Sequence, residues 1–535
     1  MGKLDIKFLW WIESQKHWTS LGWSCQLYTY TVGDKVMQVL LDIGSFVWMP
    51  DSLAPNHLDN IDLEKLDAIV LTHVHNDHVW KLAEIVKAWY RNPIYMTPLS
   101  AKFIDPILDD ALKIQRSQIT AIRDHNKRLW KKLQLAHSSI TDDRKKEKLT
   151  DRTIKQYQNL LKKYKIEKNS DIKNALLPIP LWTTFDEHDI LQTIIQIQPI
   201  EYEQEFDFIK GWWSAKFLQA GHVPWAAQVM MDLNWKKYKT EKYRYKLVNT
   251  WDLGRFHDNV LLDKPKIPLE KVDLTIIEWT YGGRNHPSRQ NEMDNFIYEL
   301  KNAQDMFVLP AFSLQRFQEI MLALWSSIES GSLNLKKEEK IFCVSPLAYK
   351  FCKILMAQDP VKYWFLAKSL FYWIQTKEDE QVVANIKWRR KIIIAWGGMV
   401  QWWSSVKYVQ QAMQNPKAHI KLTWYQATGT LGKEILDKYG TNEYVQLSDR
   451  LAPIRATVWQ LKSFSSHADE KDLVHYASKI DPRASHQLII THGGEQRFDL
   501  KQAMQTENIR TTYIIPDIYD TISIDTVTKK NITNK

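Results

Sequence analysis

The run "LDAIVLTHVHNDHV", residues 66–79, constrains this chain most strongly, because an apolar strand ends there in a cluster of ligand-type side chains. His73, His75, Asp77 and His78 fall within six positions. In an extended segment His73 and His75 point to the same side and can face one metal. Asp77 and His78 then turn toward a second metal. Imidazole and carboxylate donors without thiolate favour zinc over manganese or iron. A pair of adjacent ions suits phosphodiester chemistry, because it activates water and neutralises charge on both attacking and leaving oxygens.

Length and composition describe an ordinary globular protein of two or three domains. The chain has 535 residues, of which 44% are hydrophobic and 25% are charged. Cys25, Cys343 and Cys352 form no C-x-x-C pair, which disfavours a disulfide framework and a thiolate zinc site. No apolar run approaches the roughly 20 residues that span a bilayer, and no signal-peptide pattern begins the chain. We therefore expect a cytoplasmic protein without a membrane partner.

The positive charge is concentrated in one segment. The net charge is +10, and residues 121–170 hold 15 Lys or Arg against 6 Asp or Glu, so this segment alone carries +9. Such a segment can attract phosphate backbones. The favoured interpretation is a solvated Lys-rich helical hairpin, because Ile154, Tyr157, Leu161 and Tyr164 follow helical spacing and predict an apolar stripe.

Further motifs follow in order along the chain. The short ones are "LLDIG" with Asp42, "AGHV" with His222, "WDLG" with Asp252, "FSSHAD" with His467 and "THGGE" with His492. The longer ones are "EWTYGGRNHP", "LPAFSLQRFQEI", "AWGGMVQWW" and "WYQATGTLG". Together with the ligand run, these motifs resemble the metallo-β-lactamase fold, and specifically its β-CASP branch of nucleic-acid-cutting enzymes. The resemblance covers nearly the whole chain except the charged segment and the C-terminal tail.

The resemblance implies an α/β protein, a metallo-β-lactamase αββα sandwich with an inserted β-CASP α/β domain. Residues 1–285 would form the first part of the sandwich, with a basic helical insert at about 105–180. The resemblance of its motifs implies that residues 286–432 would be the β-CASP domain, and helices alternate there with apolar strands in α/β fashion. Residues 433–522 would close the sandwich, and 523–535 would be a polar tail.

The resemblance also assigns a role to each motif residue. His73, His75 and His222 would hold one zinc, and Asp77, His78 and His492 the other, with Asp252 shared between them. Asp42 would support the ligand loop. Glu278 and His467 would lie near the leaving group, with the glutamate orienting the imidazole. Asp77 and Asp252 would therefore belong to both the metal site and the catalytic set.

Two further features carry open alternatives. Gly397, Gly398 and Met399 predict a turn before a helix, whose N–H groups would either hold a phosphate or only connect strand to helix. Arg316 would pair either with a phosphate or with Glu319 one helical turn later.

The implied activity is zinc-dependent hydrolysis of RNA phosphodiesters, endonucleolytic, 5′-exonucleolytic or both. A histidine at the position of His492 is typical of the RNA-processing members of the branch. RNA is the expected partner, two Zn²⁺ ions are the expected cofactors with Mn²⁺ as the alternative, and a homodimer is left open. The competing hypotheses are a DNA nuclease or other hydrolase of the fold, and a catalytically silent RNA-binding relative.

Tryptophan is anomalously frequent where glycine would be expected. The chain holds 24 Trp and 17 Gly, so glycine is about 3% against a usual value of about 7%. Glycine is usual in the branch at the positions of Trp10 or Trp11, Trp48, Trp80, Trp225, Trp251, Trp402 and Trp424, and we add Trp89 and Trp396. We predict that the gene reads UGA as glycine, as some bacterial lineages do, and that these tryptophans are mistranslated codons. A Trp-rich enzyme that stacks bases on its indoles is the alternative.

Overall fold

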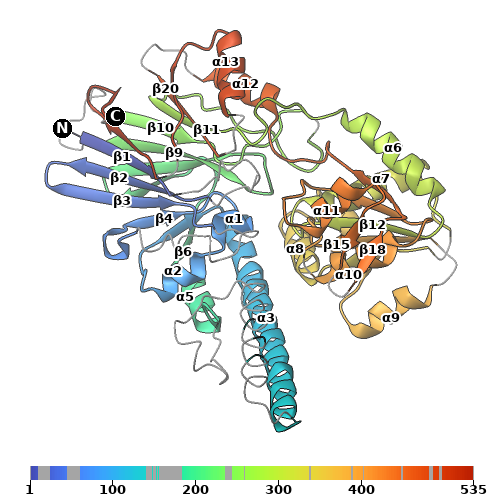
Figure 1. Ribbon diagram of the computed structural model, residues 1–535. Coiled ribbons are helices and arrows are strands. Elements are labelled where there is room, and N and C mark those ends of the chain that lie inside the picture. The colour runs from blue at the N-terminus through green and yellow to red at the C-terminus, as the bar shows by residue number, and fades with distance from the viewer. Residues whose placement is uncertain are drawn as a thin grey trace.

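The architecture was determined from a computed structural model. It describes residues 2–9, 24–44, 61–139, 148, 152, 155, 183–234, 244–257, 259–336, 339–386, 390–401, 403–447, 450–480, 486–492, 497–517 and 519–533. The molecule has two lobes, and a long helix projects away from them (Figure 1).

The first lobe is built on two sheets that pack face to face. One sheet has the order β23-β22-β1-β2-β3-β4-β5-β6 and the other β21-β20-β11-β10-β9-β8-β7. The strands of the first are β1 (Gly2–Phe8), β2 (Gln26–Val32), β3 (Lys35–Leu41), β4 (Ala68–Val70), β5 (Ile94–Met96), β6 (Ile197–Pro199), β22 (Thr521–Asp525) and β23 (Lys530–Asn531). Those of the second are β7 (Glu205–Ile209), β8 (Trp213–Gln219), β9 (Ala227–Asn234), β10 (Arg244–Asn249), β11 (Leu274–Glu278), β20 (Gln487–Thr491) and β21 (Thr512–Ile514).

Alternating apolar residues from both sheets meet between them, among them Ile6, Val39 and Val70 from one sheet and Val229 and Leu274 from the other. Helices cover the outer faces. They are α1 (Asn76–Val79), α2 (Leu82–Lys87), α3 (Pro98–Ser139) and α5 (Glu187–Gln196) beside the first sheet, and α12 (Glu470–Lys479) and α13 (Arg497–Thr506) beside the second. The predicted αββα sandwich is confirmed.

The second lobe is a six-stranded sheet of parallel strands in the order β14-β13-β15-β12-β16-β19. Its strands are β12 (Met306–Ala311), β13 (Ile341–Val344), β14 (Phe371–Trp373), β15 (Lys391–Trp396), β16 (His419–Leu422) and β19 (Thr457–Gln460). Its helices include α6 (Arg289–Asn302), α7 (Arg316–Glu329), α8 (Pro346–Gln358), α9 (Lys377–Asn385), α10 (Trp403–Met413) and α11 (Leu431–Lys438). Parallel strands buried on both faces account for apolar runs such as "KIIIAW".

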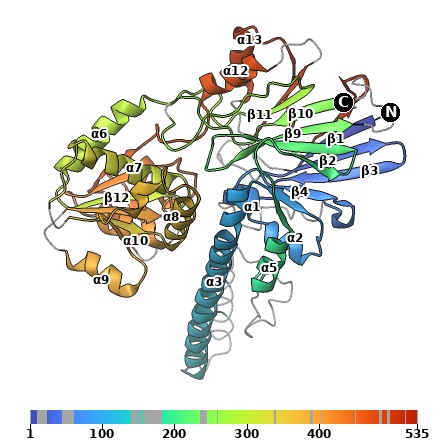
Figure 2. The same ribbon diagram turned by 180° about the vertical axis from the view of Figure 1, so that it is seen from behind.

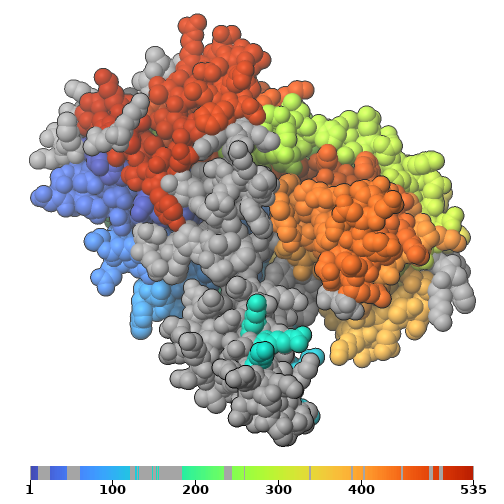
Figure 3. Space-filling view, viewed as in Figure 1, coloured from blue at the N-terminus to red at the C-terminus, as the bar shows by residue number. Residues whose placement is uncertain are grey.

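β19 pairs with β16 and so belongs to the sheet of the second lobe, although it lies beyond the expected boundary at residue 432. We therefore propose that the inserted domain extends to Gln460. In Figure 3 this lobe, coloured from yellow-green to orange, lies beside the first lobe, whose upper part is formed by red C-terminal segments.

The helix α3 links the two lobes and then leaves them. Near its start Phe103 packs edge-on against Phe351 of α8, with ring centroids 5.0 Å apart. Asp109 accepts a hydrogen bond of 2.7 Å from Lys350 of the same helix. Figure 2 shows that the rest of α3 extends beyond both lobes. The predicted apolar stripe from Ile154 to Tyr164 lies outside the described residues. Within the part of the chain that the structure describes, no helix is long and apolar enough to span a membrane.

The C-terminal residues differ from the expected polar tail. Residues 521–525 form β22, which pairs antiparallel with β1, and residues 530–531 form β23 beside it. Ile522 and Ile524 alternate with polar residues and are buried between the sheets, so a short period-2 pattern within the polar sequence supplies the last strand.

Candidate metal centre

The ligand-type residues follow the ends of strands that meet at one edge of the sandwich. β10, β11 and β20 are parallel neighbours, and Asp252, Glu278 and His492 lie at or just after their carboxyl ends. In the other sheet β3 and β4 are also parallel, and they lead into Asp42 and the run that begins at His73. Residues far apart in the sequence therefore converge because parallel strands end at the same edge.

Three imidazoles and one carboxylate form the first donor set. His75 Nδ1 lies 3.1 Å from His73 Nε2 and 3.3 Å from His222 Nε2. Asp252 Oδ2 lies 3.6 Å from His73 Nε2 and 3.5 Å from His222 Nε2. One donor atom from each of the four residues lies within 4.8 Å of all the others, so the group can hold a metal ion.

The protonation states of the first donor set suit metal binding. Burial lowers the pKa of His75 to about 4 and places the pKa values of His73 and His222 well below their ordinary range. Neutral imidazoles keep the lone pair that a metal requires. Burial raises the pKa of Asp252, but His492 and His78 outweigh it and hold that pKa well below the usual value. The donors are thus neutral imidazoles around an ionised carboxylate.

The remaining donors surround the same aspartate. His78 Nε2 lies 3.5 Å from Asp252 Oδ2 and 3.9 Å from Asp77 Oδ2, and His492 Nε2 lies 3.4 Å from Asp252 Oδ1. Oδ1 of Asp252 is buried and accepts no hydrogen bond from the described residues. A buried carboxylate oxygen without a hydrogen-bond donor fits a metal ligand, and the nitrogen and oxygen donors around it fit zinc.

Asp42 orients the second set from behind. Its carboxylate accepts hydrogen bonds from the Thr72 N–H at 2.8 Å and the Thr72 hydroxyl at 2.7 Å, and Oδ2 lies 2.7 Å from His78 Nδ1. Burial lowers the pKa of His78, but Asp252 and Asp42 raise it well above the ordinary value. A carboxylate on one imidazole nitrogen leaves the other facing the ligand position. These contacts place Asp42 beside the ligand run, and its role in supporting that loop stays a prediction.

Three hydroxyl groups contact the imidazoles, and the sequence motifs did not indicate them. Thr72 Oγ1 lies 3.2 Å from His73 Nδ1, and Ser466 Oγ lies 3.4 Å from His222 Nδ1. Ser24 Oγ lies 3.0 Å from His78 Nε2. Thr72 and Ser466 immediately precede His73 and His467, so adjacency to a motif histidine was the available signal. Ser24 has no such neighbour in the sequence.

Two glycines permit the close approach of the ligand loops. A Cβ on Gly44 would lie 1.6 Å from the Asp77 carbonyl oxygen, and a Cβ on Gly254 would lie 1.9 Å from the Gly221 carbonyl oxygen. Both contacts are impossible for any other residue. The absence of a side chain at Gly44 thus allows the loop of Asp77 to lie against the segment that follows β3. The absence of one at Gly254 allows the loop of Asp252 to lie against the loop of His222.

Glu278 and His467 form a pair beside this cluster. His467 Nδ1 lies 3.3 Å from Glu278 Oε1, which also accepts a hydrogen bond of 2.7 Å from the Leu253 N–H. Burial lowers the pKa of His467, but Glu278 raises it above the ordinary value. Donor atoms of Asp252, Glu278 and His467 lie within 4.8 Å of one another, so the pair adjoins the Asp252 carboxylate.

Of the expected substrate-binding residues, Arg316 lies near the centre, separated from it by the ring of Trp424. The Arg316 guanidinium lies 5.1 Å from the ring centroid of Trp424, whose ring lies 6.5 Å from His75 and 6.4 Å from His467. Glu319 binds Arg289 at 2.9 Å and lies 3.8 Å from Arg316. Nε and Nη1 of Arg316 are buried without a hydrogen-bond partner in the described part of the chain.

Gly397, Gly398 and Met399 lie in a turn between β15 and α10. The Gly397 N–H donates to the Ala311 carbonyl at 3.1 Å. The Gly398 carbonyl accepts from Gln426 Nε2 at 2.9 Å. These bonds fix the turn within the fold, and they leave the phosphate role of its N–H groups a prediction.

The backbone at three tryptophans has the conformation that glycine favours. Trp89, Trp225 and Trp251 have φ values of 75°, 63° and 41°. Trp251 is 1% exposed, and its indole N–H has no hydrogen-bond partner among the described residues. Its ring centroid lies 5.3 Å from that of His78 and 5.8 Å from that of His492.

A bulky side chain at positive φ is strained. Positive φ values do not occur at three of the other positions, Trp80, Trp396 and Trp424. The remaining positions lie outside the described residues; they are Trp10, Trp11, Trp48 and Trp402. Backbone conformation therefore supports the glycine prediction at positions 89, 225 and 251.

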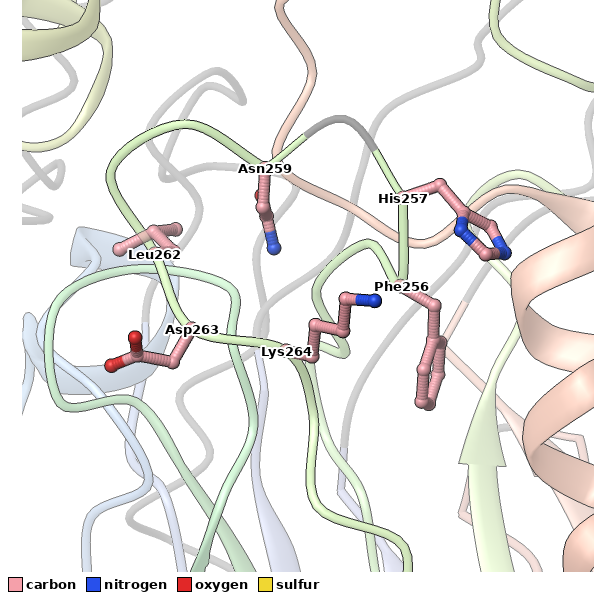
Figure 4. Close-up of a pocket in the computed structure, with 6 residues that line it drawn as sticks. All are labelled: Phe256, His257, Asn259, Leu262, Asp263 and Lys264. Atoms are coloured by element: carbon pink, nitrogen blue, oxygen red, sulfur yellow. The ribbon is translucent and has the colours of Figure 1, made fainter.

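A cavity of about 430 Å³ lies in the loop that follows Asp252, and it is lined by Phe256, His257, Asn259, Leu262, Asp263 and Lys264. Figure 4 shows the side-chain nitrogens of Asn259 and Lys264 pointing into this space, whereas the Asp263 carboxylate points away. None of the residues of the two donor sets lines this cavity.

Comparison with known proteins identifies the domains. Residues 39–136 match the model of the metallo-beta-lactamase superfamily, residues 317–435 the Beta-Casp domain, and residues 451–514 the Zn-dependent metallo-hydrolase RNA specificity domain.

Relatives of this chain include proteins that are named as ribonucleases. A ribonuclease of Thermus thermophilus is 23% identical and the match covers 86% of this chain and 88% of the relative. An RNase J-like protein of Methanocaldococcus jannaschii is 28% identical, and the match covers 58% of this chain and 71% of the relative. The endoribonuclease ysh1 of Schizosaccharomyces pombe is 23% identical, and the match covers 91% of this chain and 54% of the relative. With the sandwich, the inserted parallel sheet and the convergent histidines, these matches show that the chain belongs to the β-CASP branch of the metallo-β-lactamase superfamily.

Proposed function

We propose that this protein is a zinc-dependent ribonuclease that hydrolyses RNA phosphodiester bonds in RNA processing or decay in the cytoplasm. The observation that carries the proposal is the position of Asp252, whose carboxylate lies within 3.6 Å of nitrogens from His73, His78, His222 and His492. The ribonuclease names of the relatives support RNA as the substrate.

The residues divide into two metal sites that share one carboxylate. His73, His75 and His222 would hold one zinc, and Asp77, His78 and His492 the other, with Asp252 between them. Zinc ions bound there supply a water nucleophile at neutral pH and neutralise charge on the phosphate.

His467 serves the leaving group. Hydrolysis forms a bond between water oxygen and phosphorus and breaks the bond from phosphorus to a ribose oxygen, which must receive a proton. His467 is buried beside Asp252, and Glu278 favours its protonated form, so its imidazole would donate that proton. Glu278 is a positioning residue in this scheme, because it acts through the imidazole.

RNA cleavage by the purified protein tests the proposed function. We expect cleavage of single-stranded RNA that is lost on treatment with a chelator and restored by Zn²⁺ or Mn²⁺. Replacing His492 with alanine should strongly reduce RNA cleavage. If the His492 variant loses RNA cleavage but still cleaves DNA at the rate of the parent, the DNA-nuclease hypothesis is favoured. If the unaltered protein binds RNA but does not cut it with any metal ion added, the hypothesis of a catalytically silent RNA-binding relative is supported.

Glu278→Gln is expected to lower kcat on RNA by about 10² and leave KM nearly unchanged. Glutamine still offers a carbonyl oxygen to the Leu253 N–H, so the loop keeps its anchor, while the charge that orients His467 is lost. Steady-state kinetics provide the measurement. A rise in KM with unchanged kcat would contradict the positioning role.

A further inference from the structure

The outer part of α3 presents exposed basic side chains. From residue 121 onward the described side chains of this helix are Asp124, Lys127, Arg128 and Lys131, and all four are exposed. Lys148, Arg152 and Lys155, described singly further along the chain, are exposed as well. Six of these seven side chains are cationic. We call the described residues from 121 to 139, with these three, the basic arm.

The seven described side chains of the arm have a net charge of +5, from six cations and Asp124, and they lie in the most basic segment of the sequence. Residues 121–170 account for +9 of a net +10, so the two lobes together are close to neutral. The described cations therefore give the outer part of α3 and the three single residues a positive field. Such a field attracts a polyanion to these side chains.

The start of α3, the helix that carries the arm, is hydrogen-bonded to the loop that follows His222. The Thr97 hydroxyl donates to the Trp225 carbonyl oxygen at 2.7 Å, and Ser100 donates to the same oxygen at 3.3 Å. Trp225 follows the ligand-type His222 by three residues. With 42 residues, α3 rises about 63 Å from this start. A polymer that enters the centre can therefore meet the arm at a distance that the helix fixes.

We propose that the basic arm binds the phosphate backbone of RNA that flanks the bond being cut. This inference rests on the proposed ribonuclease function. Lysine and arginine side chains on one exposed helix contact phosphates without reading bases, so the arm would increase affinity for long RNA whatever its sequence. Figure 1 shows the arm at the end of the molecule opposite α12 and α13, well outside the two lobes.

The test compares a triple variant, Lys127→Gln with Arg128→Gln and Lys131→Gln, with a matched control. The control changes Lys377, Lys479 and Lys530 to glutamine; these lysines are also exposed, and they lie on α9, α12 and β23. Both variants lose three positive charges. The probes are a single-stranded RNA of about 8 nucleotides, the size of one binding groove, and one several times longer.

The arm variant should bind the long RNA on the order of 10-fold more weakly at 0.1 M salt, and the slope of log K against log salt should fall by about 2. Its cleavage of the short RNA should equal that of the parent, and the control should bind both RNAs normally. Equal affinity of parent and arm variant for long RNA would overturn the inference. Absence of RNA cleavage by the parent would instead contradict the proposed function, and the binding comparison would still decide whether the arm holds RNA.

Discussion

Replacing Asp252 with asparagine is expected to lower the rate of RNA cleavage by about 10³ or more and to reduce bound zinc. Both oxygens of this carboxylate face imidazole nitrogens of the two donor sets, and a neutral amide cannot serve both. Metal ions contribute several kcal/mol of charge stabilisation in the transition state, and each 1.36 kcal/mol is about tenfold in rate. Single-turnover cleavage and metal analysis of the purified variant measure the two effects.

The matched control is Asp207→Asn, which changes an exposed carboxylate on β7. It should retain both zinc and activity, because its side chain lies on the surface. Cleavage by Asp252→Asn at the parental rate would exclude the shared-carboxylate scheme. Full zinc content with lost cleavage would show that Asp252 acts on the reaction and not on metal affinity.

The protein made by its native host is expected to contain glycine at positions 89, 225 and 251. These residues adopt φ values between 41° and 75°, a region that glycine enters freely and that a large side chain enters only under strain. At position 251 an indole also fills space beside His78 and His492. Mass spectrometry of peptides from the native protein, or the codons of the gene, decides the question. Indole mass in these peptides, or UGG codons, would refute the prediction.

The same claim can be tested on stability with a recombinant chain. Trp89 is 80% exposed, so Trp89→Gly leaves little cavity and should raise the free energy of unfolding by about 1 kcal/mol through relief of backbone strain. Trp364→Gly is the control, because Trp364 lies in a 3-10 helix and packs edge-on against Trp325, with ring centroids 5.5 Å apart. That change should destabilise the protein. Destabilisation by both would argue for a true tryptophan at position 89.

The sandwich and the convergence of the ligand-type residues could be predicted from the sequence, because both depend on short motifs tied to strand ends. His73 and His75 follow the apolar β4, and His492 follows β20, so each strand assignment also located a donor. The order of the motifs along the chain matched the pattern of the metallo-β-lactamase fold, and that resemblance implied that their residues meet at one site. The distances around Asp252 agree with that prediction, whereas the assignment of each residue to a metal remains a proposal.

Features that depend on long-range packing could not be predicted. β19 joins the inserted sheet only through its pairing with β16, and its sequence would suit either lobe. β22 is a polar segment that becomes a strand because β1 offers it an open edge. Ser24 reaches His78 across 54 positions, and Arg289 competes with Arg316 for Glu319. In each case tertiary contacts decide between local alternatives that the sequence leaves equal.

The pairing of β22 with β1, and of β20 with β11, sets an order for assembly during synthesis. Both sheets of the first lobe need strands from beyond residue 486, and His492 lies on one of those segments. The parallel sheet of the second lobe needs nothing beyond Gln460 and can form earlier, since domains generally fold as units. The ribosome must therefore release residues beyond His492, and for β22 as far as Asp525, before the centre is complete, so a shorter nascent chain lacks part of the donor set.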